Sequence, residues 1–145
     1  MKIEGNAIST DPETVLRNYL DALIAGDIAA IESSFAPDAT WWVHGRLPMS
    51  GTKRGRAEIL EFLLSAGSMY RAGTQELEFG DITAAGDRAV LEWRVRAIGT
   101  ATGKPYDNSY AGVFVIRDGW IVEVREYLDS LHTAEVIYGA VTSGI

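Results

Sequence analysis

The chain has 145 residues, of which 47% are hydrophobic and 23% charged, and its formal net charge is −7. A chain of this length buries one core, so we expect residues 1–145 to form a single domain, with any pocket inside that core. The acidic net charge argues against a nucleic-acid-binding surface. The absence of cysteine excludes disulfides, thiolate nucleophiles and thiolate metal sites.

The first half of the chain predicts helices. Asp11 before Pro12 is a helix start, and Gly26 is a stop. Asp27 can cap a second, short helix that ends at Pro37. The first helix carries an apolar stripe at helical spacing, formed by Val15, Leu16, Tyr19, Leu20, Leu23 and Ile24.

A short strand, a loop and a third helix are predicted next, at residues 39–43, 45–55 and 56–66. The second half changes to runs rich in β-branched and aromatic residues, separated by turn residues. These runs predict a four-stranded antiparallel meander followed by a short helix at residues 130–138. The order of elements indicates an α+β domain whose helices cover one face of the sheet. The predicted strands are residues 75–84, 88–98, 106–117 and 120–128.

Alternation along the strands gives the sheet two unequal faces. The face that we expect to meet the helices is mostly apolar and aromatic, with Glu126 as its one carboxylate. It collects Leu91, Trp93, Val95, Asn108, Tyr110, Gly112, Phe114, Val124, Glu126 and Leu128. The other face is charged, and there Arg94 and Arg96 are expected to face Glu123, Arg125 and Asp129 as a charged ladder or a dimer surface.

Glu126 is the best candidate for chemistry. A carboxylate under an apolar roof has a raised pKa, which suits a general acid or base. The alternative is an ion pair or a partly solvated place at the sheet rim. Tyr19 could donate to an oxyanion or pack as core, and Asn108 and Tyr110 could orient a ligand or only bond to each other.

Alternation in the first strand points Trp41 and Val43 one way and Trp42 and His44 the other. His44 and His132 lack partners at metal-ligand spacing, so we expect no metal. There is no G-x-S-x-G motif and no phosphate-binding loop with the required spacing, so we expect no serine nucleophile and no nucleotide cofactor. No segment is typical of a signal peptide or a membrane span, which favours a cytoplasmic location without membrane contact.

Three stretches resemble a known superfamily across about residues 11–138. They are YLDALIAGDIAAIESSFAPDATWW, the G-T-x-x-G-R-x-x-I-x-x-F-L run at residues 51–63, and TGKPYDNSYAGVFVIRDGWIVEVREYLDSLHTAEVI. They resemble the nuclear transport factor 2-like superfamily, within it the SnoaL-like, ketosteroid isomerase and limonene epoxide hydrolase branches. The resemblance implies a cone: a curved, mainly antiparallel sheet wrapped around three N-terminal helices, enclosing an apolar pocket. It also implies a homodimer through the outer sheet face, where we expect Val113, Ile121 and Tyr127.

The resemblance transfers catalytic residues only in part. Tyr19 stands where ketosteroid isomerases have an oxyanion-hole tyrosine, but their base falls on Val43 and their second acid near Gly112. Glu126 matches one carboxylate of the epoxide hydrolase Asp-Arg-Asp group, whose Arg and other Asp fall near Trp93 and Val95. The water-positioning Tyr and Asn of that family fall near Trp41 and Val43. A slide of one residue would bring Arg94 into the pocket, which the local pattern does not favour.

These observations favour a cofactor-free enzyme of isomerase or cyclase type that moves protons on a small hydrophobic, cyclic or polyketide-like molecule. A non-catalytic binding or assembly domain is the alternative, and epoxide-hydrolase-like water addition is the third possibility. Glu126 and Tyr19 are the expected catalytic residues. The expected substrate-binding residues are Trp41, Val43, Phe62, Trp93, Val95, Asn108, Tyr110, Phe114, Val124 and Leu128.

Overall fold

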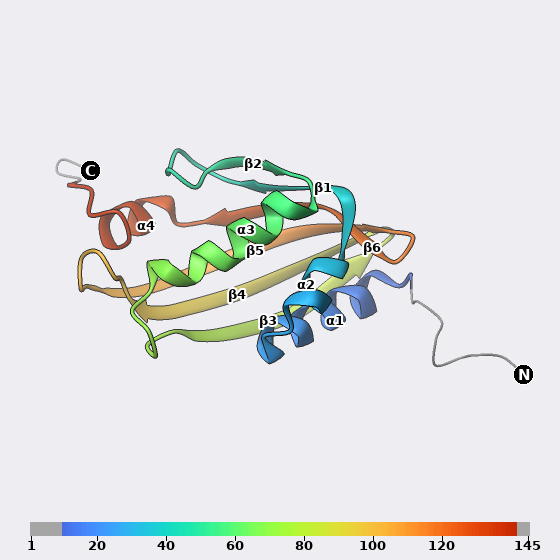
Figure 1. Ribbon diagram of the computed structural model, residues 1–145, viewed down its shortest axis with the longest axis horizontal. Helices are drawn as coiled ribbons and strands as arrows, with labels where there is room; N and C mark the ends of the chain where they lie inside the picture. Colours follow the sequence, from blue (N-terminus) through green and yellow to red (C-terminus); the bar gives the residue numbers. More distant parts are fainter. Residues whose placement is uncertain (1–9, 142–145) are drawn as a thin grey trace, which may run out of the picture.

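One six-stranded sheet carries the fold in the computed structural model, which describes residues 10–141 (Figure 1). The strand order is β2-β1-β6-β5-β4-β3, and every neighbouring pair is antiparallel except β1 with β6, which run parallel. The sheet is therefore mixed and open. Its strands are β1 (Phe35–Val43), β2 (Gly51–Arg54), β3 (Glu76–Ala85), β4 (Arg88–Ile98), β5 (Pro105–Arg117) and β6 (Trp120–Leu128).

The first two helices begin at aspartate residues that cap them, and the first ends at a glycine in the left-handed conformation. The Asp11 side chain accepts a hydrogen bond from the Thr14 amide at 3.0 Å, and Gly26 ends the first helix in the left-handed region, at φ 68°. Asp27 caps the second helix through the Ala30 amide at 3.1 Å. The helices are α1 (Pro12–Ala25), α2 (Ile28–Ser33), α3 (Arg56–Ala66) and α4 (Ser130–Val136), and a short 3-10 turn, Gly67–Met69, follows α3.

The helices gather against one face of the sheet. Helix α1 contacts β3, β4, β5 and β6, whereas α3 contacts β1 and β2, so the two helices cover different parts of the same face (Figure 1). The core lies between them and the sheet. In the part of the chain that the structure describes, no helix has the length and apolar character needed to cross a membrane.

The predicted meander is confirmed, and two local predictions are wrong. Strand β1 begins at Phe35, four residues earlier than expected, because Phe35 pairs with Ile121 and the Ser34 carbonyl accepts from the Ile121 amide. The second helix accordingly ends at Ser33 and not at Pro37, which lies inside this strand. Residues 51–54, predicted as loop, form strand β2 along β1. Both errors concern backbone that is ordered by a partner strand distant in sequence.

The alternation of faces is confirmed over most of the sheet. Trp41 and Val43 are buried, while Trp42 is half-buried and His44 exposed on the outer face. Ile121, expected on the outer face, is instead fully buried. The register of β5 against β6 shifts between Val115 and Ile116, and this irregularity turns Ile121 into the core.

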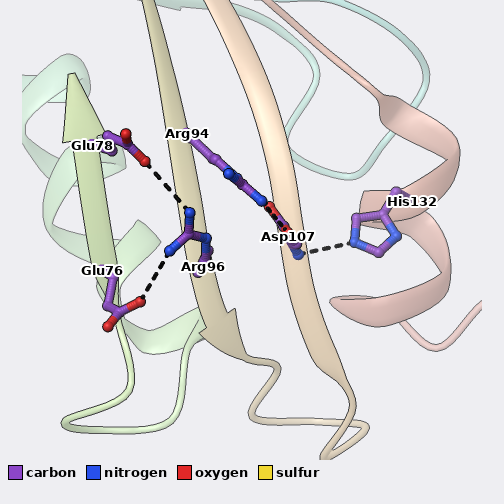
Figure 2. Close-up of polar contacts among 6 residues, drawn as sticks. All are labelled: Glu76, Glu78, Arg94, Arg96, Asp107 and His132. Carbon is purple, nitrogen blue, oxygen red and sulfur yellow. Dashed lines mark hydrogen bonds and ion pairs between the residues drawn. The ribbon is translucent and has the colours of Figure 1, made fainter. Parts of the chain in front are cut away.

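The outer face carries a ladder of charged residues, but the carboxylates that pair with Arg94 and Arg96 differ from those expected. Strand β4 lies between β3 and β5, so Arg94 and Arg96 cannot reach the β6 carboxylates. Arg94 instead makes two 2.7 Å hydrogen bonds with Asp107, and Arg96 lies 3.7 Å and 3.6 Å from Glu76 and Glu78 (Figure 2). Arg94 thus stays outside the core, as the local pattern favoured.

Gly112 lies on the inner face between Leu91 and Glu126, its partners on β4 and β6. A Cβ at this position would stand 2.8 Å from Phe114 Cε1 and 2.9 Å from Trp93 Cζ3. Both contacts are too short for carbon atoms. The two aromatic rings therefore occupy the space that a side chain at position 112 would need.

We expect Gly112→Ala to destabilise the protein by about 1–3 kcal/mol, because the two rings must leave their packed positions. Urea unfolding followed by circular dichroism measures the change. Gly67→Ala is the matched control, since Gly67 has φ −62° and open space at its Cβ position. Equal stability of the Gly112→Ala and Gly67→Ala variants would contradict this account.

Candidate active site

A cavity of about 150 Å³ lies between the inner face of the sheet and helices α1 and α3. A cavity of this volume accommodates one benzene-sized ring. Its wall is mostly apolar and aromatic. Of the residues predicted to form the site, those that line the cavity are Tyr19, Trp41, Phe62, Trp93, Val95, Tyr110, Phe114 and Glu126.

Four predicted substrate-binding residues do not line the cavity. Val43 and Val124 are fully buried in the hydrophobic core. Leu128 is half-buried and packs both against this core and against a smaller apolar cluster that contains Val95 and Tyr106. Asn108 is buried in a polar network beside the cavity. Alternation had given these residues the correct face of the sheet, but other side chains cover them.

Glu126 is the carboxylate that the cavity encloses. Its side chain rises from β6 on the inner face, and the residue is only 6% exposed. The indole N–H of Trp41 donates to Glu126 Oε1 at 2.9 Å. The parallel pairing of β1 with β6 sets Trp41 beside Val124 and Val43 beside Glu126, which brings the indole within reach.

The environment of Glu126 raises the pKa of its carboxyl group into the physiological pH range. Burial raises the pKa of this carboxyl to about 7, and the Trp41 hydrogen bond and the Lys53 charge offset only part of that effect. Near neutral pH the group is therefore present in both its protonated and its ionised form. A carboxyl group in this state can take up and release a proton in one cycle.

Tyr19 brings a phenol to the same cavity from α1. Its ring packs edge-on against Phe35, with centroids 5.3 Å apart, and the residue is 2% exposed. Burial, and next the charge of Glu126, raise the pKa of its hydroxyl, so the phenol stays protonated. No residue within the described range 10–141 forms a hydrogen bond with this hydroxyl. Its O–H is thus free to donate to a ligand.

Tyr110 has the opposite character, because its hydroxyl joins a buried network. The Thr133 hydroxyl donates to the Asp129 carbonyl at 3.1 Å and so can only accept from Tyr106, at 2.8 Å. Tyr106 has then used its proton, and it accepts from Tyr110 at 2.5 Å. The Tyr70 hydroxyl is a further hydrogen-bond partner of Tyr110. Tyr110 therefore has no free proton, and what it can offer the cavity is a remaining oxygen lone pair.

Asn108 holds this network in place and does not orient a ligand directly. Its amide nitrogen lies 2.9 Å from the Tyr106 hydroxyl, 3.0 Å from Thr133 Oγ1 and 3.0 Å from the Asp129 carbonyl, so its two N–H groups are shared among three acceptors. The aromatic ring of His132 stacks on Tyr106 with an interplanar angle of 4°, closing the network from the outside.

A family model matches most of this chain and identifies its family. Residues 16–124 match the family model described as SnoaL-like domain, which is most of the chain. The chain belongs to the SnoaL-like domain family. A comparison with curated protein sequences finds no match.

Solved structures with the same fold agree with this assignment. An NTF2-like protein from Burkholderia thailandensis superposes with a TM-score of 0.78 at 23% identity, covering 88% of this chain and 97% of that one. TerC, co-crystallised with polyporic acid, gives 0.74 at 23% identity, with coverages of 88% and 98%. A Bacillus subtilis protein provisionally named an isomerase gives 0.70 at 21% identity, with coverages of 89% and 94%. These likenesses show that the chain shares its fold with NTF2-like proteins.

Sequence reasoning missed several groups at the site of this SnoaL-like domain. Met49 lines the cavity from a predicted loop, Tyr70 from a segment without a predicted element, and Gln75 from the first position of a predicted strand. Lys53 approaches from β2, a strand of only four residues without an apolar pattern. The usable signal was the placement of Lys53 opposite Trp41, which appears only once the two strands are paired.

The histidines of the SnoaL-like domain lie outside the cavity. The His44 ring packs edge-on against Trp42 and at a tilt against Tyr127 on the outer face. His132 Nε2 accepts from the Asp107 amide at 3.1 Å (Figure 2). Within residues 10–141, no three His, Asp or Glu side chains gather in a way that could hold a metal ion.

The raised pKa of Glu126 makes stability depend on pH. Between pH 4.5 and 7 the native state binds a proton that the unfolded state has released, so the free energy of unfolding must fall as pH rises through this window. We expect wild type to lose about 3 kcal/mol relative to Glu126→Gln across the window. Urea unfolding of both proteins at several pH values measures the difference, and parallel curves would contradict it.

Proposed function

We propose that this SnoaL-like domain is a cofactor-free enzyme that moves protons on small hydrophobic single-ring compounds, in reactions of the isomerase or cyclase type. The observation that carries the proposal is one buried carboxyl, Glu126, with a pKa of about 7 in an otherwise apolar, ring-sized cavity. Such a group removes a proton next to a carbonyl without a metal or an organic cofactor.

The arrangement around Glu126 gives each polar group a role. Glu126 acts as the base in its ionised form and returns the proton as an acid. Tyr19 donates its free O–H to the oxygen on which negative charge develops. Tyr110 accepts a hydrogen bond from the substrate, and Trp41 keeps the carboxylate oriented through the 2.9 Å bond. Phe62, Trp93 and Phe114 exclude water and hold the ring.

Two features disfavour the epoxide-hydrolase-like alternative. Arg94 lies on the outer face, in an ion pair with Asp107, and the matching pocket positions hold Trp93 and Val95. Water activation would need polar side chains there. A Gly at position 112 and a Val at position 43 likewise leave no second carboxyl group for the ketosteroid isomerase mechanism.

The experiment follows proton exchange and needs no known substrate. The protein is incubated in deuterated buffer with a panel of single-ring ketones, and deuterium uptake next to the carbonyl is measured by NMR. We expect exchange above the buffer rate, a loss of about 100-fold or more in Glu126→Gln, and a smaller loss in Tyr19→Phe. The rate should rise with pH to a plateau above pH 7, since the ionised form is the base.

Glu123→Gln is the matched control for this measurement. Glu123 is on the same strand, on the outer face, where it bonds to Arg125 at 2.6 Å. This variant should exchange at the wild-type rate. Ring ketones that bind without exchange would overturn the enzymatic proposal in favour of a ligand-binding domain, as would full exchange by Glu126→Gln.

We also propose that the chain forms a homodimer through the outer face of the sheet. The support is an aromatic group on this face, where the ring centroids of Trp42 and Tyr127 lie 5.3 Å apart and Tyr127 is 39% exposed. Tyr127→Asp should shift the protein from dimer to monomer in sedimentation velocity. Leu64→Asp, on the exposed side of α3, should leave the dimer intact, and a wild-type monomer would contradict the proposal.

A further inference from the structure

The side chain of Lys53 belongs to the inner face of the sheet. Lys53 pairs with Trp41 across the antiparallel β1 and β2 strands, so the two side chains share one face. The neighbours Thr52 and Arg54 are exposed, whereas Lys53 is half-buried. Strand β2 thus sends one cation toward the cavity and leaves the next one, Arg54, in solvent.

The ammonium group contacts two residues that line the cavity. Lys53 Nζ lies 4.8 Å from the centroid of the Phe62 ring, over its face. It donates to the carbonyl of Met49 and, at 3.3 Å, to that of Gly51. Phe62 and Met49 both line the cavity. Lys53 itself does not line the cavity, so the nitrogen lies directly behind these two lining side chains.

Lys53 lacks a counter-ion in direct contact. An ammonium has three N–H donors, and two of them point to neutral carbonyls. Within the described part of the chain no carboxylate forms an ion pair with it, although the charge of Glu126 acts on it through space. Lys53 is half-buried, and this burial lowers the pKa of its ammonium group.

A partly desolvated cation with one free donor favours an anion beside it. When Glu126 is protonated, no negative charge within the cavity lining balances Lys53. We infer that Lys53 binds a carboxylate group of the substrate at the β2 side of the cavity, which makes the preferred substrates single-ring carboxylic acids. This inference rests on the proposed function, because it names the substrate class of the same cavity.

The assignment predicts a charge preference that two probes of equal size can measure. Benzoate and benzamide share one ring and differ in charge. Binding is followed by the fluorescence of Trp41 and Trp93, which line the cavity, at about pH 6, where Glu126 is mostly protonated. Wild type should bind benzoate about 10-fold or more tightly than benzamide, the effect of one charge-assisted hydrogen bond. Added salt should weaken benzoate and leave benzamide unchanged.

Variants at positions 53 and 54 separate recognition from structure. Lys53→Met should remove the preference for benzoate while benzamide still binds. Lys53→Gln retains a donor for the Met49 carbonyl and serves if the methionine variant fails to fold. Arg54→Met removes a positive charge from the same strand, on its exposed side, and should keep the preference.

The outcomes are decisive in both directions. Equal binding of the two probes by wild type overturns the inference, and so does a preference that survives in Lys53→Met or Lys53→Gln. The readout needs no turnover, so a benzoate preference without deuterium exchange would leave Lys53 in its role while the catalytic proposal fails. Deuterium exchange on ketones without a preference for benzoate would support the catalytic proposal and overturn the role of Lys53.

Discussion

The hydrogen bond from Trp41 to Glu126 holds together the part of the molecule where chemistry can occur. A carboxylate loses several kcal/mol of hydration when it is buried, and a single indole N–H returns only part of that loss. Glu126 therefore remains close to the balance between its two protonation states. The rest of the cavity follows from this balance, since apolar walls that keep water away also keep the carboxyl from ionising fully.

Polar groups around the cavity come from elements that are distant in the sequence, and each has a different capacity. Tyr19 on α1 has a proton to donate, Tyr110 on β5 has a lone pair, and Lys53 on β2 has a charge. In the proposed function, a bound ring meets a donor, an acceptor and a base in the cavity, with the cation of Lys53 behind the lining residues Phe62 and Met49. Orientation of this kind lets a small cavity select a substrate without many contacts.

The sequence predicts most of the fold, but only some of the residues that form the cavity. Alternation along β4, β5 and β6 is a local property, so Glu126, Trp93 and Phe114 could be assigned to the inner face directly. Whether a residue on that face lines the cavity depends on what lies over it, so the sequence could not show that Val124 and Asn108 lie outside the cavity lining. Lys53 escaped notice because a four-residue strand shows its face only through its pairing partner.

The parallel pairing of β1 with β6 also determines when the molecule can be completed. Strand β1 is made early, yet the strand that covers its inner edge ends at Leu128, close to the end of the described chain. Helix α1 also lacks its partners until then, since they are β3 to β6. During synthesis the N-terminal third therefore emerges with its apolar stripe uncovered, and the contacts of long sequence separation that close it make folding slow. The same topology that isolates the carboxyl from water leaves the nascent chain dependent on its last strand.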